Sequence, residues 1–398
     1  MKDNKGPAEN AGTICSICIS KENGGGHTLP VRIERAVLQG GQGIAGDVHG
    51  SREGRGLVFL DAKAGHWMKE AGMQGLCFSR FHANFLTEGL DYAVLKEGDL
   101  ISAGTALIEI TKMGKRCFDE CARMQHSLEC MLRDHVFFTR VLKGGTVIPG
   151  DGVSFFASAD QGRRYSRQLM VSGLGICGQM RIAQSSAIVI GAGGLGCPVI
   201  TALASAGVGR IGIADKEEVE LSNLNRQYLY LPDDIGKRKA KKAGEWVSRF
   251  RPDCRVDVFD TEVTRENAEG LIKDYDIVLL ALDTVSARMV LNTAAVRLKK
   301  PLVEGAADGF YGSVTARLGE GDPCLACVNP KGREPVKNSG AFSPVTMLIG
   351  AFQAQTALRY LAGLQSKGGM WSYDGSCGCF EEVPIQKNPD CKVCRNQV

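Results

Sequence analysis

The segment AIVIGAGGLGCPVI, residues 187–200, restricts the fold of this chain more than any other stretch. A hydrophobic run typical of a buried strand leads into a glycine cluster, and a helix-like stretch follows. Glycine permits close backbone approach, so Gly191, Gly193 and Gly194 can bring backbone N–H groups and a helix N-terminus up to phosphate oxygens. Asp215 ends the next strand-like segment, RIGIAD, where an acceptor for ribose hydroxyls belongs. We therefore expect a nucleotide site whose ligand the glycines do not identify; a tight turn without a ligand is the alternative.

Length and composition limit the class of protein. The chain has 398 residues, enough for two domains of about 100–200 residues each. Its net charge of +4 is too small to favour a general nucleic-acid binder, so no DNA partner is expected. No apolar run reaches the roughly 18–20 residues that span a bilayer, and the N-terminus is polar, so we expect a cytoplasmic protein without a membrane partner. Fifteen cysteines in that compartment indicate metal binding, sulfur chemistry or buried thiols.

The sequence pattern changes at residues 154–162, in SFFASADQG. Before this segment, short strand-like runs alternate with glycine-rich turns. After it, strands such as SAIVIGA and DIVLLAL alternate with helical stretches such as KAKKAGEWVSRF, as in α/β proteins. We therefore predict a β-rich domain over residues 12–153. Residues 160–398 are predicted to form a Rossmann-like, mainly parallel sheet with helices on both faces.

Two C-x-x-C pairs in the second domain predict a metal site. They are Cys324 and Cys327 in DPCLAC, and Cys391 and Cys394 in NPDCKVC. Two such knuckles make a tetrahedral site for structural Zn²⁺, because four thiolates leave no open position for a substrate. Free thiols in turns are the alternative. A third such pair, Cys15 and Cys18, lies in a strand-like stretch that points its two cysteines to opposite faces, so no metal is expected there.

From Arg164 to Cys394 the chain resembles the ubiquitin-activating-like family of ThiF, MoeB and HesA. The matching segments are RYSRQ, GAGGLGCPV, ADKEEVELSNLNRQ, DIGKRKA, GAADGFYGSV, CLAC, LIGAFQAQTALRYL and NPDCKVC. Such enzymes use ATP and Mg²⁺ to adenylate the C-terminal glycine of a small ubiquitin-like protein, releasing pyrophosphate. The acyl-adenylate then accepts sulfur, or the protein passes to a thiol. The resemblance implies that the glycine cluster binds ATP rather than NAD.

The resemblance also implies a role for individual residues. The nucleotide-binding set it implies is Gly191, Gly193, Gly194, Asp215, Ser222, Asn223, Asn225, Arg226, Lys239, Asp283 and Thr284. Arg226 and Lys239 neutralise charge at the α-phosphate as pyrophosphate leaves, and Asp283 lies near Mg²⁺. Arg167, in RYSRQ, acts on the active site of the partner subunit in a homodimer. Surface ion pairs for the arginines and a helix cap for Asp283 are the alternatives.

Two positions depart from the family pattern. Thr284 stands where asparagine is usual. The loop Pro335–Phe342, PVKNSGAF, has no cysteine, whereas some members carry one there for sulfur or thioester chemistry. Adenylation does not require that cysteine, but a covalent step on this loop is not expected.

Residues from about 12 to 153 resemble the MOSC domain of molybdenum-cofactor sulfurases. The matching segments are GIAGDVHG, FHANFLTEGLDYAVLKEGDLISAGTALIEIT and KRCFDEC, with Ala83 in place of the usual glutamate. The resemblance implies a β-barrel-like fold and a role for Cys117 in carrying sulfur or contacting molybdenum cofactor or molybdopterin. Lys115 and Arg116 precede Cys117, and nearby cations favour a reactive thiolate. A metal site of Cys117, Cys121, Cys130 and His126 is one alternative, and inert buried cysteines are another.

Together these features predict an enzyme of molybdenum or tungsten cofactor biosynthesis. The second domain would adenylate a molybdopterin-synthase-type sulfur carrier that ends in Gly-Gly, and the first would bind cofactor or handle sulfur. Adenylation of a thiamine-type carrier, a peptide or a tRNA base is the first alternative. A non-catalytic module that docks a carrier or a cofactor is the second.

Overall fold

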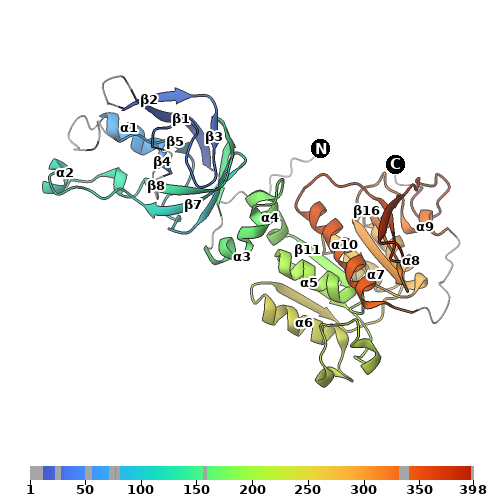
Figure 1. The fold of residues 1–398 in the computed structure, drawn as a ribbon. Coiled ribbons are helices and arrows are strands. Elements are labelled where there is room, and N and C mark those ends of the chain that lie inside the picture. Colours follow the sequence, from blue (N-terminus) through green and yellow to red (C-terminus); the bar gives the residue numbers. More distant parts are fainter. Residues whose placement is uncertain are drawn as a thin grey trace. The chain divides into compact units, whose positions relative to one another are not determined.

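The computed structural model describes residues 12–22, 28–49, 56–70, 77, 81–126, 128–155, 159–330 and 340–395. The chain divides into two compact units, Met1–Cys177 and Gly178–Val398, each with its own sheet (Figure 1). The division falls inside helix α4 (Gly175–Gln184). No helix among the described residues is both long and apolar enough to cross a membrane.

The first unit contains a closed β-barrel. Its strands are β1 (Gly12–Glu22), β2 (Thr28–Ile33), β3 (Ala36–Leu38), β4 (Leu57–Asp61), β5 (Phe85–Glu88), β6 (Leu100–Ala103), β7 (Ala106–Met113), β8 (Val136–Lys143), β9 (Gly145–Val147) and β10 (Gly152–Phe155). Seven of them form a ring in the order β10-β6-β7-β8-β4-β5-β1, which closes because β1 also pairs with β10. The neighbours are antiparallel except β4 and β5. β2 extends the ring from β1, and β3 pairs with β9. The expected barrel-like fold is confirmed.

The barrel is filled by aliphatic and aromatic side chains from all around the ring. On β1, Ile14 and Ile17 are both fully buried although they are three residues apart. The register shift between Ile14 and Ser16 is a bulge that turns both side chains inward. Phe59 is fully buried and stacks on Phe85 and Phe137, with ring centroids 4.7 and 4.8 Å apart respectively. These three rings join β4, β5 and β8 into one core.

Short helices lie between the strands of the barrel and after the last of them. Helix α1 (Ala62–Glu70) follows β4, and α3 (Ala159–Leu169) follows β10. The connection between β7 and β8 carries α2 (Ala122–Gln125) and the 3₁₀ turn η2 (Met131–Arg133). Figure 1 shows this connection projecting well beyond the ends of β7 and β8.

The second unit is an eight-stranded sheet with helices. Its strands are β11 (Ser186–Ile190), β12 (Arg210–Ala214), β13 (Arg255–Phe259), β14 (Ile277–Leu280), β15 (Leu302–Asp308), β16 (Tyr311–Arg317), β17 (Gly369–Asp374) and β18 (Cys379–Val383). The order is β13-β12-β11-β14-β15-β16-β17-β18. The first five strands are parallel, and the last three extend the sheet in antiparallel fashion. The carboxyl ends of β11, β12 and β14 therefore meet at one edge.

Helices lie on both faces of this sheet, as expected. Its main helices besides α4 are α5 (Gly196–Ala206), α6 (Lys239–Phe250), α7 (Ala268–Ile272), α8 (Val285–Arg297), α9 (Leu325–Val328) and α10 (Ser343–Leu361). Ile188 and Val278 form one buried cluster with Leu271 of α7 and Leu291 of α8. On the other face, α5 contacts β11, α6 contacts β13 and α10 contacts β15. There Gln353 of α10 donates hydrogen bonds to the carbonyls of Leu280 and Val303, each at 2.9 Å.

The barrel core predicts a specific loss of stability. Phe59→Ala is expected to lower the free energy of unfolding by about 3–5 kcal/mol, because it removes two stacked contacts and leaves a cavity. Leu29→Ala, at a side chain 54% exposed on β2, should change it by less than about 0.5 kcal/mol. Denaturant unfolding of the full chain measures both. Equal losses in the two variants would contradict this view of the core.

Candidate nucleotide site

The turn after β11 is held tightly against the ends of β12 and β14. The Gly191 N–H donates to Ala214 O at 2.8 Å, and the Ala281 N–H donates to Ile190 O at 2.8 Å. Gly191 has a φ of 98°, and a Cβ there would lie 2.3 Å from Ala281 O. A Cβ on Gly196 would lie 2.0 Å from Gly191 O. The backbone packing at both positions therefore requires glycine.

Gly193 and Gly194 differ from these two, because the protein leaves room beside them. A Cβ on Gly193 would meet nothing closer than Gln227 Nε2 at 3.6 Å, and one on Gly194 would touch the Arg226 side chain at 3.3 Å. Both residues line a cavity of about 2030 Å³. Glycine at these positions keeps the backbone N–H groups accessible from the cavity, as phosphate binding requires.

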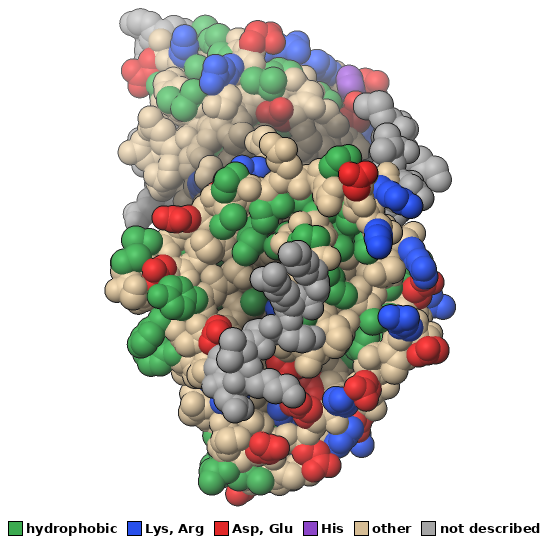
Figure 2. All heavy atoms as spheres, turned by 90° about the vertical axis from the view of Figure 1, so that its right-hand side faces the viewer, with side chains coloured by type: hydrophobic (Ala, Val, Ile, Leu, Met, Phe, Trp, Pro, Cys, Tyr) green, Lys and Arg blue, Asp and Glu red, His purple; other side chains and the backbone are tan. Residues whose placement is uncertain are grey.

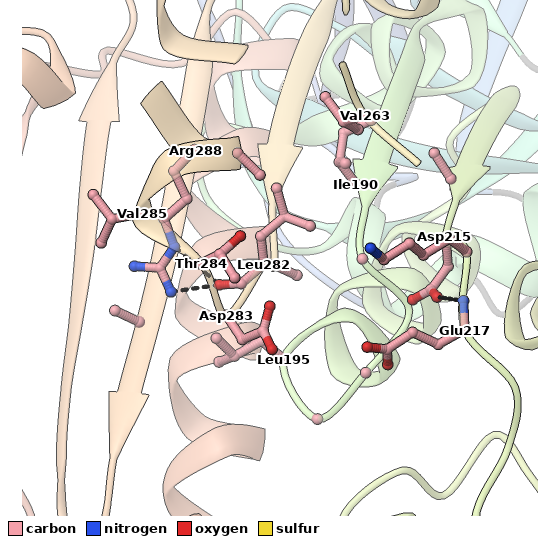
Figure 3. Close-up of a pocket in the computed structure, with 18 of the residues that line it drawn as sticks. Ile190, Leu195, Asp215, Glu217, Val263, Leu282, Asp283, Thr284, Val285 and Arg288 are labelled. Carbon is pink, nitrogen blue, oxygen red and sulfur yellow. Dashed lines mark hydrogen bonds between the residues drawn. The ribbon is translucent and has the colours of Figure 1, made fainter. Parts of the chain in front are cut away.

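Asp215 joins the ends of β12 and β11. Its Oδ2 accepts the Ala192 N–H and its Oδ1 accepts the Glu217 N–H, both at 2.7 Å. Burial raises the pKa of this carboxyl, while the two N–H donors and nearby Lys239 lower it. Each carboxylate oxygen keeps a further lone pair for a hydroxyl donor. The side chain lies in the cavity beside the glycine turn (Figure 3).

The segment after β12 brings a cation to the glycine turn. Asn223 is buried and accepts the Glu220 N–H at 3.1 Å, whereas Ser222 is exposed. Arg226 donates to Ser222 O and to Asn225 Oδ1, each at 2.9 Å, and its side chain lies against Gly194. Within the part of the chain that the structure describes, no carboxylate forms an ion pair with Arg226. Its charge is therefore available to an anion in the cavity.

Lys239, at the start of α6, supplies a second cation. Its side chain is only 4% exposed, and its Nζ lies 2.7 Å from Glu217 Oε2, a carboxylate that is 55% exposed. The Tyr230 hydroxyl donates to Ala192 O at 2.6 Å and lies 3.4 Å from Lys239 O, so it ties the glycine turn to the start of α6. The ammonium group is thus fixed, while its partner Glu217 lies at the surface of the cavity.

Asp283 and Thr284 approach the cavity from β14. Thr284 is the N-cap residue of α8, without a side-chain capping hydrogen bond, and both residues are exposed. Figure 3 places Asp283 on one side of the glycine turn and Asp215 with Glu217 on the other. Neighbouring Arg288 is already paired, with its Nη1 2.6 Å from Glu304 Oε1. Among the described residues Asp283 forms no ion pair, so its carboxylate can approach a bound cation.

The structure brings most of the predicted nucleotide-binding residues to this one cavity. Its lining includes Gly191, Gly193, Gly194, Asp215, Ser222, Asn223, Arg226, Lys239, Asp283 and Thr284. Asn225 is not among the lining residues and holds Arg226 instead. Arg167 is exposed on α3, in the unit that also contains Cys117. The roles given to these three residues, and to the residues that line the cavity, stay predictions.

Three residues of the site were not predicted. Glu217 pairs with Lys239, and Tyr230 anchors the turn. Gln227 is 3% exposed and lines the cavity, and its Oε1 has no hydrogen-bond partner among the described residues. The only sequence signal for Gln227 is its place directly after Arg226, and nothing in the sequence pairs Glu217 with a lysine 22 residues away.

The four cysteines of the two C-x-x-C pairs come together. The Sγ–Sγ distances are 3.9 Å for Cys324–Cys327, 3.7 Å for Cys324–Cys391 and 3.5 Å for Cys327–Cys394. A tetrahedron with Zn–S bonds of about 2.3 Å has sulfurs about 3.8 Å apart, so the donor set fits zinc. Asn292 of α8 accepts the Leu325 N–H at 3.0 Å and so fixes the first knuckle.

The other predicted metal alternative is wrong. Cys117, Cys121, Cys130 and His126 do not converge, because among the described residues the four cysteines above are the one group whose ligand atoms lie close enough for a metal. Cys121 is buried at the N-cap of α2, while Cys117 and Cys130 are half-buried.

Comparison with known proteins agrees with this geometry. The family model "ThiF family" matches residues 165–393, more than half of the chain. The chain belongs to the ThiF family. The MOSC domain model matches residues 45–154, so both resemblances noted in the sequence are confirmed.

Curated relatives match more than half of this chain. A sulfur carrier protein adenylyltransferase of Thermus thermophilus is 37% identical over 246 residues, 59% of this chain and 91% of that protein. The protein "Adenylyltransferase and sulfurtransferase MOCS3" of Culex quinquefasciatus is 38% identical over 239 residues, 58% of this chain. The chain spans about half the length of such MOCS3 relatives, 55% in that case. A crystal structure of E. coli MccB shares the fold, with a TM-score of 0.54 at 18% identity over 59% of this chain and 75% of that one.

The two kinds of glycine predict opposite results on stability. Gly191→Ala is expected to lower the free energy of unfolding by at least about 2 kcal/mol, because the new Cβ meets Ala281 O and φ is positive. Gly193→Ala should leave it within about 0.5 kcal/mol, since the cavity has room for a methyl group. Thermal and denaturant unfolding of the two variants test this. A stable Gly191→Ala protein would show that the turn is not fixed by that contact.

Proposed function

We propose that this protein adenylates the C-terminal glycine of a ubiquitin-like sulfur carrier of the molybdopterin-synthase type, in molybdenum or tungsten cofactor biosynthesis. The observation that carries the proposal is Arg226, a cation without a carboxylate partner in the described structure, held against Gly194 in a cavity that also contains Lys239. The fold class supports it: the parallel part of the sheet is Rossmann-like, with the ligand at the carboxyl ends of its strands. The printed name of the Thermus relative, a sulfur carrier protein adenylyltransferase, also supports it.

In the proposed reaction, a carboxylate oxygen of the carrier attacks the α-phosphorus of ATP, and the bond to the bridging oxygen breaks as pyrophosphate leaves. The N–H groups near Gly193 and Gly194 bind phosphate oxygens, and Asp215 accepts the ribose hydroxyls. Arg226 and Lys239 stabilise the negative charge that develops. Lys239 is available for this because phosphate oxygens can replace the exposed carboxylate of Glu217. Asp283 would hold Mg²⁺, which adds charge neutralisation at the triphosphate.

The size of the cavity supports a second, macromolecular substrate. Sites for small molecules typically occupy about 300–1,000 Å³, and this cavity of about 2030 Å³ extends past Thr284 to Asp308 and Tyr311 at the turn between β15 and β16. Beside that end, Phe310, Tyr311 and Phe342 are 53%, 58% and 47% exposed. Figure 2 shows hydrophobic side chains gathered on one face of the protein. The elongated cavity can accept an extended carrier tail. The exposed aromatic residues beside it suit the docking of the carrier body.

We further propose the remaining organisation. The domains are residues 12–153, a MOSC domain that handles sulfur or binds molybdenum cofactor through Cys117, and 160–398, the adenylating domain. Arg167 acts across a homodimer interface. Leu221 and Leu231, 73% and 65% exposed, are candidates for that interface. No disulfide joins any two cysteines of the described residues, which supports a reducing, cytoplasmic location.

Adenylation is tested by ATP–pyrophosphate exchange with carriers that end in Gly-Gly. Lys239→Ala is expected to reduce carrier-dependent exchange at least about 100-fold, because a buried charge beside the transferred phosphate is removed. Lys241→Ala, two residues along the same helix with a side chain 64% exposed, should stay within about twofold. If none of these carriers supports exchange, or if the two variants exchange at equal rates, the proposal is contradicted. The alternatives are then a peptide, thiamine-carrier or tRNA substrate, or a docking module.

Zinc is tested by metal analysis of the purified full chain. We expect about one zinc per chain, because the four sulfurs already have tetrahedral spacing. Cys394→Ser should lose most of the metal and lower Tm, since metal binding contributes to folding. Cys379→Ser, at an exposed thiol of the same unit, is the matched control and should keep both. A content of far less than one zinc per full chain would contradict the proposed zinc site.

A further inference from the structure

The connection between β7 and β8 forms a lobe whose two ends lie side by side. The Gly114 N–H donates to Val136 O at 2.7 Å, and the Lys115 N–H donates to Leu132 O at 2.8 Å. Cys117 and Cys130 lie two residues beyond Lys115 and Leu132 on the two sides of the lobe. A side-chain hydrogen bond joins the two thiols.

Other contacts hold this base in place. The Arg123 Nε donates to Glu129 O at 2.9 Å, which joins the two sides of the lobe. The Arg123 guanidinium also lies 4.9 Å from the ring centre of Trp67 on α1. These contacts help to fix the positions of the segments that carry Cys117 and Cys130.

The side chains around the pair favour thiol chemistry. The Lys115 ammonium lies 5.2 Å from the ring centre of Phe118 and 5.8 Å from that of Phe81, so a cation is fixed next to the Cys117 segment. Burial is the main cause that raises the pKa of the Cys130 thiol, so this thiol reacts through a minor thiolate form.

A metal does not explain these thiols. In the described part of the chain the only metal-like group is the four-cysteine cluster of the second unit. Two thiols in contact can form a disulfide, which needs a Cα separation of about 4.4–6.8 Å.

We propose that Cys130 is the resolving thiol for sulfur carried on Cys117. The inference rests on the proposed role of Cys117 in sulfur handling. When a persulfide or polysulfide donor has loaded Cys117, the Cys130 thiolate attacks the Cys117 Sγ. The bond to the terminal sulfur breaks, and that sulfur leaves with the electron pair as hydrosulfide. The products are a Cys117–Cys130 disulfide and one hydrosulfide ion.

The step complements the adenylation chemistry. Hydrosulfide is a nucleophile for a carrier acyl-adenylate, where it displaces AMP and leaves a thiocarboxylate. An external dithiol then returns the disulfide to two thiols by exchange, so each sulfur released oxidises one dithiol. Cys130 thus converts a bound sulfane sulfur into a free nucleophile.

The test uses the full chain and inorganic polysulfide under anaerobic conditions, followed by desalting. The wild type is expected to release about one hydrosulfide per chain and to give a disulfide-linked pair of peptides containing Cys117 and Cys130. Cys130→Ser and Cys130→Ala should keep the persulfide on Cys117 and release hydrosulfide at least about tenfold more slowly. Cys117→Ser should give no linked pair, and Cys77→Ser, the matched control, should behave as wild type.

Each other outcome has a defined meaning. Unchanged release in both Cys130 variants, or a linked pair that contains Cys77, overturns the resolving role. If the wild type gives no linked pair and the Cys130 variants hold no persulfide on Cys117, the inference fails together with the sulfur-handling proposal. ATP–pyrophosphate exchange, measured on the same samples, reports adenylation separately, because it needs neither Cys117 nor Cys130.

Discussion

The contact on which the second unit most depends is the approach of the Gly191 backbone to the ends of β12 and β14. It allows the Gly191 N–H to reach Ala214 O and places the next residue, Ala192, where it donates to Asp215 and accepts from Tyr230. Through Tyr230 the same contact fixes the start of α6, and with it Lys239. A side chain at Gly191 would separate these strand ends. The acidic and basic groups of the cavity are therefore arranged by one tight turn rather than by independent loops.

The charges around that turn explain why the site suits a triphosphate better than an uncharged ligand. Most basic side chains lining the cavity are paired with carboxylates, as Arg288 is with Glu304. Arg226 is held by a backbone carbonyl and an amide, which orient a guanidinium without neutralising it. Lys239 is held by a carboxylate that is more than half exposed, so little is lost when an anion replaces it. The site thus keeps its positive charge ready for an incoming anion.

Local chemistry explains what the sequence could predict. The glycine turn, the acidic end of β12 and the C-x-x-C knuckles are each specified by residues within a few positions, so the strands, Asp215 and the cysteine pairs were predictable. The closure of the barrel was not specified in that way, because it pairs Gly12 with Val153 across the whole unit. The same holds for the ion pair of Glu217 with Lys239 and for the hydrogen bond between the Cys117 and Cys130 thiols. These contacts depend on how strands and loops pack, which no short motif encodes.

The thiols of the two units differ in their surroundings. Near the glycine turn the second unit offers Cys197, but burial raises the pKa of that thiol to about 12, so it is a poor nucleophile. The four clustered cysteines have the spacing of metal ligands, which would leave no free thiolate for reaction. The Pro335–Phe342 loop has no cysteine, and its residues 335–339 lie outside the described structure. In the proposed reaction the adenylate takes its sulfur from outside this unit, although Cys377 and Cys379 are exposed thiols of the unit. We propose Cys117 and Cys130 of the barrel unit, which are half-buried and joined by a hydrogen bond, as the source within this chain.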